Sequence, residues 1–165
     1  MLQIRFRLLI SVLFLIHFSQ ISLAQNKTLS NLEITTLLHD AKLNRINGLY
    51  EESLLKSRVA LEQSIKSKRN DLIANSYLII ASNFDELTEP LKALHYYNLG
   101  LHYANKTNNF TLKNQFYNNL GNIYCFDKKQ YDKGIYYYHK SLKQSQRILD
   151  KKQVYFISLL SICSI

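Results

Sequence analysis

Carboxamide side chains recur along one face of a helix predicted over residues 110–126. Gln115, Asn119 and Asn122 are followed by Phe126, at spacings of four, three and four. These spacings place the four side chains on one face of an α-helix. A carboxamide both donates and accepts hydrogen bonds, so a row of them suits the backbone of an extended peptide without reading its sequence. The pattern indicates peptide binding; the alternative is a polar helix face that is simply solvated.

The same face occurs twice more, in two earlier helices and at a constant offset along the sequence. One set has Asn75 and Ser82 where the first has Gln115 and Asn122. The members of this second set are Asn75, Ile79, Ser82 and Glu86. The members of the third set are Thr35, His39, Lys42 and Ile46. Along the chain, each set lies 40 positions after the previous one at all four places. We therefore expect the three helices that carry them to be equivalent elements of a repeat.

Patterns that would indicate an enzyme or a metal site are missing from the sequence. His95 and His102 share a helix face, but no third ligand accompanies them. Cys125 and Cys163 form no CxxC motif and lie in apolar stretches, so we expect them to be buried free thiols. No Ser/His/Asp or Cys/His arrangement is found. We therefore expect no catalytic residue, no cofactor and no metal.

The charge of the chain is basic but dispersed. There are 21 Lys and Arg residues against 12 Asp and Glu, giving a formal net charge of +9. The lysines are scattered, without a run of five or more basic residues. A nucleic-acid-binding domain would show a clustered basic stripe, so we expect no nucleic-acid partner for this segment.

Small residues mark the places where helices approach each other. Ala41, Ala81 and Gly121 recur at intervals of 40, and Ala60 and Gly100 do the same. A fixed period of this size indicates stacked repeats, and four glycines and one proline are too few for an all-β fold. Hydrophobic periodicity predicts helices near 34–46, 50–66, 71–84, 90–105, 110–126, 131–148 and 153–165. The fold class we predict is all-α, a stack of antiparallel helix hairpins.

In register, these residues resemble the tetratricopeptide repeat. Its first helix has a large residue, then Leu-Gly or Leu-Ala, then an aromatic; its second has small, aromatic and small residues. The best match is Tyr77, Ile80-Ala81, Phe84, Ala93, Tyr97 and Gly100. The next unit has Tyr117, Leu120-Gly121, Tyr124, Gly134, Tyr138 and Ser141. The first unit is degenerate, with Leu37, Asp40-Ala41, Asn44, Ser53, Ser57 and Ala60.

The repeats are longer than the family's usual unit of about 34 residues and resemble the long-repeat bacterial type. We place units at about 34–68, 71–107 and 110–150, with a partial fourth at 153–165. Ala81 and Ala93 are 12 apart, whereas Gly121 and Gly134 are 13 apart. We expect the extra residue to lie in the turn between the two helices of the third unit.

The resemblance implies a right-handed superhelix with a concave groove. In the family this groove is lined by first-helix residues that face away from the second helix. The residues implied here are Gln115, Asn119, Asn122, Phe126, Asn75, Ile79, Ser82, Glu86, His39 and Lys42. Some relatives hold a peptide's C-terminal carboxylate with Lys and Arg on this face. Gln115 and Asn119 occupy those places in the third unit, so we do not expect that clamp.

Residues 1–24 have the pattern of an export signal. Arg5 and Arg7 precede an apolar stretch over residues 8–18, and Ser22 and Ala24 supply small residues at −3 and −1 of a cleavage site. We expect cleavage before Gln25, with an uncleaved anchor as the alternative, and a polar lead-in over 25–33. The predicted location is exported, either periplasmic or at the extracellular face of the inner membrane.

The predicted helix over 153–165 has first-helix register but no second helix after it. Three interpretations stay open: the chain continues in a longer protein, the helix pairs with another chain or a second copy, or it begins a membrane span. The resemblance and this feature together favour a non-enzymatic, protein- or peptide-binding module. It would form the extracytoplasmic sensor or interaction region of a larger bacterial signalling or regulatory protein. The alternative is a structural scaffold or assembly factor of the cell envelope.

Overall fold

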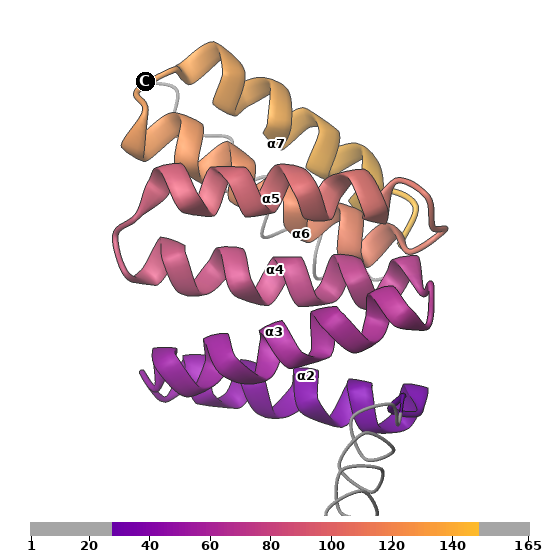
Figure 1. Cartoon of the computed structure of the whole chain (residues 1–165). Helices are drawn as coiled ribbons and strands as arrows, with labels where there is room; N and C mark the ends of the chain where they lie inside the picture. The colour runs from indigo at the N-terminus through magenta and orange to yellow at the C-terminus, as the bar shows by residue number, and fades with distance from the viewer. Residues whose placement is uncertain (1–27, 149–165) are drawn as a thin grey trace, which may run out of the picture.

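Three antiparallel helix hairpins stack into an α-solenoid in the computed structural model, which describes residues 28–148. Each hairpin turns on one side of the stack, at the left in Figure 1, and each connection to the next hairpin lies on the other side. The predicted all-α stack of hairpins is confirmed. The elements are α2 (Asn31–Ile46), α3 (Tyr50–Lys66), α4 (Asn70–Glu86), α5 (Pro90–Ala104), α6 (Phe110–Asn122), the π-helical turn η1 (Ile123–Asp127) and α7 (Tyr131–Ser145).

Small residues stand where an aromatic ring of a neighbouring helix occupies the space that a larger side chain would need. A Cβ added to Gly100 would lie 2.4 Å from Cζ of Phe116, which belongs to the next hairpin. A Cβ added to Gly121 would lie 2.6 Å from the ring of Tyr138, in the same hairpin. Phe116 is fully buried, and its ring forms a T-shaped contact with that of Tyr97. The repeat of small residues in the sequence therefore corresponds to a repeat of helix contacts.

The first helix begins earlier than the sequence analysis expects. Ser30 caps α2: its Oγ accepts a hydrogen bond from the backbone N–H of Glu33 at 3.3 Å. The Glu33 carboxylate accepts one in return from the backbone N–H of Ser30 at 2.8 Å. This reciprocal arrangement is a capping box, and it starts the helix at Asn31. The expected lead-in to residue 33 is therefore too long by three residues.

The extra residue of the third hairpin lies inside a helix and not in the turn. Each hairpin turn contains one residue with positive φ: Gly48, Thr88 and Lys129 in the three hairpins. In every hairpin the first small residue of the second helix follows it by five positions. Gly48 and Thr88 follow Ala41 and Ala81 by seven residues, whereas Lys129 follows Gly121 by eight.

The hydrogen bonds locate the same insertion. The backbone N–H of Glu89 donates to the carbonyl of Phe84, five residues back, and the equivalent bond from Gln130 reaches Tyr124, six back. The π-helical turn Ile123–Asp127 takes up the additional residue, because each of its bonds spans one residue more than in an α-helix. Our expectation of a longer hairpin turn is wrong, and the turn itself keeps the form of the other two.

The predicted export signal over 1–24, the predicted helix over 153–165 and Cys163 lie outside the described residues. Within residues 28–148, no helix combines the length and the hydropathy that crossing a membrane requires.

Candidate functional site

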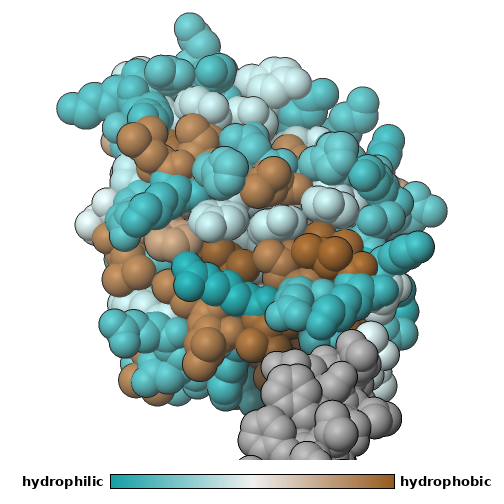
Figure 2. Space-filling view, in the orientation of Figure 1, coloured by the Kyte–Doolittle hydropathy of each residue, from teal (hydrophilic) through white to brown (hydrophobic). Residues whose placement is uncertain are grey.

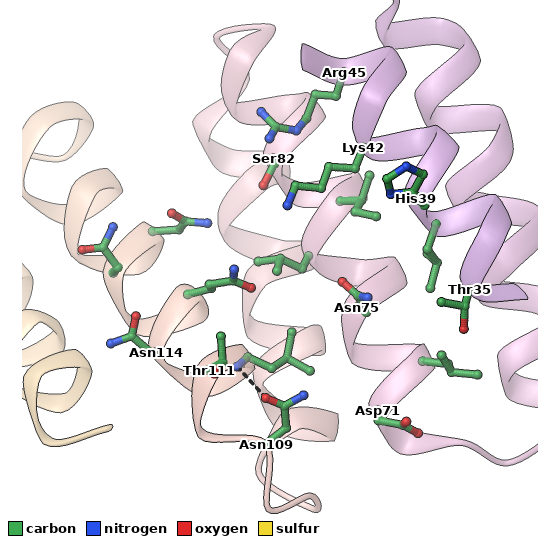
Figure 3. A pocket seen from close by; sticks show the side chains of 18 residues that line it. Thr35, His39, Lys42, Arg45, Asp71, Asn75, Ser82, Asn109, Thr111 and Asn114 are labelled. Carbon is green, nitrogen blue, oxygen red and sulfur yellow. Dashed lines mark hydrogen bonds between the residues drawn. The ribbon is translucent and has the colours of Figure 1, made fainter. Parts of the chain in front are cut away.

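A groove of about 960 Å³ runs across the first helices of the three hairpins. Its lining comes from α2, α4 and α6, with Asn109 at the start of α6 (Figure 3). These three helices lie next to one another, α2 against α4 and α4 against α6. The groove is therefore built by equivalent faces of equivalent helices, and no residue of α3, α5 or α7 lines it.

The floor of the groove is apolar. It is formed by aliphatic side chains that are no more than 8% exposed, so their tips belong to the core and only a small part of each reaches the groove. These residues are Leu38, Leu72, Leu78, Ile79 and Leu112. An apolar group that entered the groove would meet this floor and leave water behind, which is favourable.

One wall of the groove, on α2, is basic. His39, Lys42 and Arg45 line it, and Figure 3 shows Lys42 and Arg45 extending from α2 over the groove. The guanidinium of Arg45 forms an ion pair with Glu86 of α4, at 3.0 Å. Lys42 is exposed and forms no ion pair within residues 28–148. Its ammonium group is consequently the available positive charge on this wall.

The opposite wall, on α6, is rich in carboxamides, but these do not all serve one purpose. Asn109 caps α6, since its Oδ1 accepts from the N–H of Leu112 at 2.9 Å, the dashed line in Figure 3. Asn114 is buried and donates to the carbonyl and the hydroxyl of Ser141 and to the hydroxyl of Ser145. The side chain of Asn109 is therefore committed to the start of α6, and that of Asn114 to the contact between α6 and α7.

Three other carboxamides around the groove have no such commitment. Asn75, Gln115 and Asn119 take part in no side-chain hydrogen bond among the described residues, and each is at least partly exposed. Beside them, Oδ1 of Asn118 is buried without a partner in that part of the chain. A polar atom that is buried and unpaired is costly, so this acceptor favours a donor from a bound molecule or from water.

Two carboxylates have shifted pKa values, Asp71 in the groove lining and Asp85 outside it. Asp71 accepts hydrogen bonds from Arg69, and these lower the pKa of its carboxyl group. Burial raises the pKa of Asp85, although a hydrogen bond donated by Tyr97 opposes the shift. The hydroxyl of Tyr97 also lies 3.1 Å from that of Ser82, a groove residue.

The structure brings most of the predicted binding residues together. Thr35, His39, Lys42, Asn75, Ile79, Ser82, Gln115 and Asn119 line the groove. Glu86, Asn122, Phe126 and Ile46 do not.

The predicted residues outside the groove have identifiable reasons for their position. Glu86 is paired with Arg45, and the carboxamide of Asn122 accepts a hydrogen bond from Tyr138. Phe126 and its equivalents Ile46 and Glu86 all lie beyond the end of the groove, and Phe126 is in addition within the π-helical turn. Phe126 is more than half exposed but does not belong to the groove lining.

Sequence reasoning missed a second stripe of groove residues. Leu38, Leu78 and Asn118 line the groove and recur at the same period of 40, as do Asp71 and Thr111. The period that revealed the first stripe could have found this one. Asn109 and Asn114 gave no such signal, because neither has an equivalent carboxamide in the other hairpins.

The two histidines of α5 lie at the surface, whereas the cysteine that the structure describes is buried. His95 and His102 are exposed on α5 and pack edge-on against Tyr96 and Tyr103. Residues 28–148 contain no group of three or more His, Cys, Asp or Glu side chains that could hold a metal ion. Cys125 is a buried thiol, as predicted.

Comparisons with known proteins establish the fold alone. No family model matches the chain. No curated protein matches it either. Among solved structures, the crystal structure of BtubC (BKLC) from P. vanneervenii superposes with a TM-score of 0.69 at 18% sequence identity. The match covers 84% of this chain and 58% of that one, so this chain spans a little over half the length of its structural relative.

Proposed function

We propose that this chain is a non-enzymatic binding module that holds an extended segment of another protein in the groove across α2, α4 and α6. The observation that carries the proposal is the set of uncommitted carboxamides, Asn75, Gln115 and Asn119, around an apolar floor. Carboxamides can pair with the N–H and C=O groups of an extended backbone, and the floor accepts side chains from one side of it.

We propose further that the chain is a tetratricopeptide-like protein of the long-repeat type and works outside the cytoplasm. The small and aromatic residues of the second and third hairpins support the first part, and the apolar stretch and small residues within positions 1–24 support the second. A module of this kind suits the sensing or interaction region of a larger bacterial signalling protein.

Selection of peptides on the whole protein tests the groove. Random peptides displayed on phage are selected on the native protein, and the enriched peptides are then measured by fluorescence anisotropy. We expect the variant Gln115→Ala/Asn119→Ala to weaken their binding by about tenfold, since two hydrogen bonds to the backbone are lost. The matched control is Asn98→Ala, which removes an exposed carboxamide from α5. Equal loss in both variants, or none in either, would contradict a groove site.

A second candidate function, a scaffold or assembly factor, rests on a different surface. The edge that carries the three hairpin turns exposes two large hydrophobic residues at every turn, and Figure 2 shows hydrophobic side chains reaching this left edge. These residues are Ile46, Leu49, Leu87, Leu91, Phe126 and Tyr131. Exposed apolar residues in a regular row mark interaction surfaces. Under this hypothesis Ile46→Gln/Leu91→Gln abolishes assembly in sedimentation experiments and leaves peptide binding in the groove unchanged.

A further inference from the structure

The groove contains one positive charge that the fold does not neutralise. Of the charged residues lining it, Asp71 is paired with Arg69 and Arg45 is paired with Glu86. Lys42 is left without an ion pair within the described part of the chain. The apolar floor beside it lowers the local polarity, and a charge next to such a surface attracts an opposite charge more strongly than one in open water does.

The repeat shows how the surroundings of Lys42 differ from those of its two equivalents. Lys42, Ser82 and Asn122 occupy equivalent positions at intervals of 40. In the second and third hairpins, a tyrosine of the second helix reaches this position from beneath: Tyr97 contacts Ser82, and Tyr138 contacts Asn122. These contacts hold the two polar side chains against their own hairpins.

The first hairpin lacks this tyrosine. Ser57 stands at the position equivalent to Tyr97, one repeat earlier, and its hydroxyl donates to the carbonyl of Leu54 within its own helix. Ser57 is buried and too short to reach Lys42. The first hairpin thus differs from the other two in two respects at this position. It has the charged Lys42 on its first helix, and its second helix provides no tyrosine hydroxyl that could contact this residue.

We propose that the groove takes an acidic peptide segment, with a side-chain carboxylate at Lys42. The backbone of the segment lies across the carboxamides of α4 and α6, and an apolar side chain of the segment rests on the floor around Leu78 and Ile79. The inference rests on the proposed peptide-binding function and specifies its ligand. Because Lys42 lies on α2, the acidic residue belongs to the end of the segment that binds the first hairpin.

Two matched pools of short peptides test this assignment. Both are labelled with fluorescein, are amidated at the C-terminus and contain leucine at fixed positions; one carries Glu at a fixed position and the other Gln. We expect the whole protein to bind the acidic pool about tenfold more tightly at low salt, the value of one hydrogen-bonded charge pair. The preference should decline as salt is added.

The variants separate Lys42 from the general positive charge of the protein. Lys42→Gln should remove the preference for Glu, and Lys42→Glu should invert it toward a pool carrying Lys. Lys66→Gln, which removes the same charge from the last turn of α3, should keep the preference. Circular dichroism confirms that each variant is folded.

The outcomes distinguish this inference from the function on which it rests. Equal binding of the Glu and Gln pools overturns the acidic ligand and leaves the peptide-binding groove intact. A preference for Glu that survives in Lys42→Gln overturns the role of Lys42. Absence of binding to either pool contradicts the proposed function as well.

Discussion

The hydroxyl of Tyr138 donates to Oδ1 of Asn122 at a distance of 2.8 Å, and so joins the second helix of the third hairpin to the outer side of its first helix. Asn122 belongs to the carboxamide row of the sequence, one turn after Asn119. The hydrogen bond gives the two residues different roles. Asn119 lies in the groove without a partner among the described residues, whereas Asn122 is engaged in the hairpin and does not line the groove.

Replacing these two asparagines should therefore have separate effects. Asn119→Ala should weaken peptide binding and leave the free energy of unfolding unchanged. Asn122→Ala should leave binding nearly unchanged and lower the free energy of unfolding by about 1 kcal/mol, the value of one lost hydrogen bond. Urea denaturation and fluorescence anisotropy on the same samples measure both quantities. If Asn122→Ala abolished binding in a stable protein, the division of roles would be wrong.

Gly100→Ala should destabilise the protein although alanine favours helices. A Cβ at this position would lie 2.4 Å from Cζ of Phe116 and 2.9 Å from Cβ of Tyr77. Overpacking of this kind lowers the free energy of unfolding by about 1–3 kcal/mol, which exceeds the gain of about 1 kcal/mol in helix propensity. The measurement is again urea denaturation.

Two controls test whether the loss of stability in Gly100→Ala comes from overpacking against Phe116. Gly48→Ala adds a Cβ with no atom within 4 Å, so only its positive φ of 76° opposes the substitution. Truncating the ring with Phe116→Leu should recover part of the stability of Gly100→Ala. It should recover none in Gly48→Ala, and equal recovery in both would exclude the steric explanation.

The buried pair Ser53 and Asn83 should prove interdependent. Asn83 donates to the hydroxyl of Ser53 at 2.8 Å, and Ser53 donates to the carbonyl of Ala41, so the pair links three helices. Ser53→Ala should lower the free energy of unfolding by about 1–2 kcal/mol, because it leaves buried polar groups unpaired. The third hairpin has buried Ile123 where the second has Asn83.

A double-mutant cycle follows from this equivalence. Ser53→Ala/Asn83→Leu replaces both polar groups with apolar ones, and it should be more stable than the sum of the two single changes implies. Chemical denaturation of the four proteins gives the coupling. Strict additivity would mean that the two side chains act independently.

Asp85→Asn should stabilise the protein at neutral pH. Burial raises the pKa of Asp85 in the folded state, so the folded protein binds this proton more readily than the unfolded chain does. The contribution of Asp85 to stability is therefore greatest below the unfolded pKa of about 4, and declines as the pH rises through the folded pKa. Replacing the carboxylate removes that decline, and Asn can still accept the hydrogen bond from Tyr97.

Thermal unfolding between neutral pH and about pH 3 checks this expectation. The advantage of Asp85→Asn over the native protein should be present at neutral pH and shrink in acid. Asp132→Asn, which removes an exposed carboxylate from α7, controls for the change in net charge. A native protein more stable than Asp85→Asn at neutral pH would show that the ionised carboxylate supports the fold.

The parts of this structure that sequence reasoning predicted are those determined by size and period. Gly121 must be small because Tyr138 occupies the adjacent space, and small residues recur at the equivalent positions Ala41 and Ala81. The groove side of each first helix follows from about 3.6 residues per turn as far as Asn119. It fails at Phe126 and at the equivalent Ile46 and Glu86, because the groove ends before these positions, which a count of residues per turn does not predict.

Other parts depend on contacts that no period records. Asn114 resembles its neighbours in type, but its partners Ser141 and Ser145 lie on another helix. Likewise, Lys42 receives no hydroxyl from the second helix of its hairpin, whereas Tyr97 and Tyr138 reach Ser82 and Asn122. A composition or spacing rule cannot express either relationship, since both require knowing which helices lie against each other.

The π-helical turn at Ile123–Asp127 has a consequence for how this chain could have arisen. If its hairpins descend from one duplicated unit, the third gained a single codon after the duplication. An insertion in the middle of a helix would ordinarily rotate every later side chain out of register. Here the wider turn accommodates the added residue locally. Lys129, Gly134 and Tyr138 therefore occupy the same structural positions as their equivalents in the second hairpin. A π-helical turn thus allows one repeat to be a residue longer while the contacts of the residues after it stay the same.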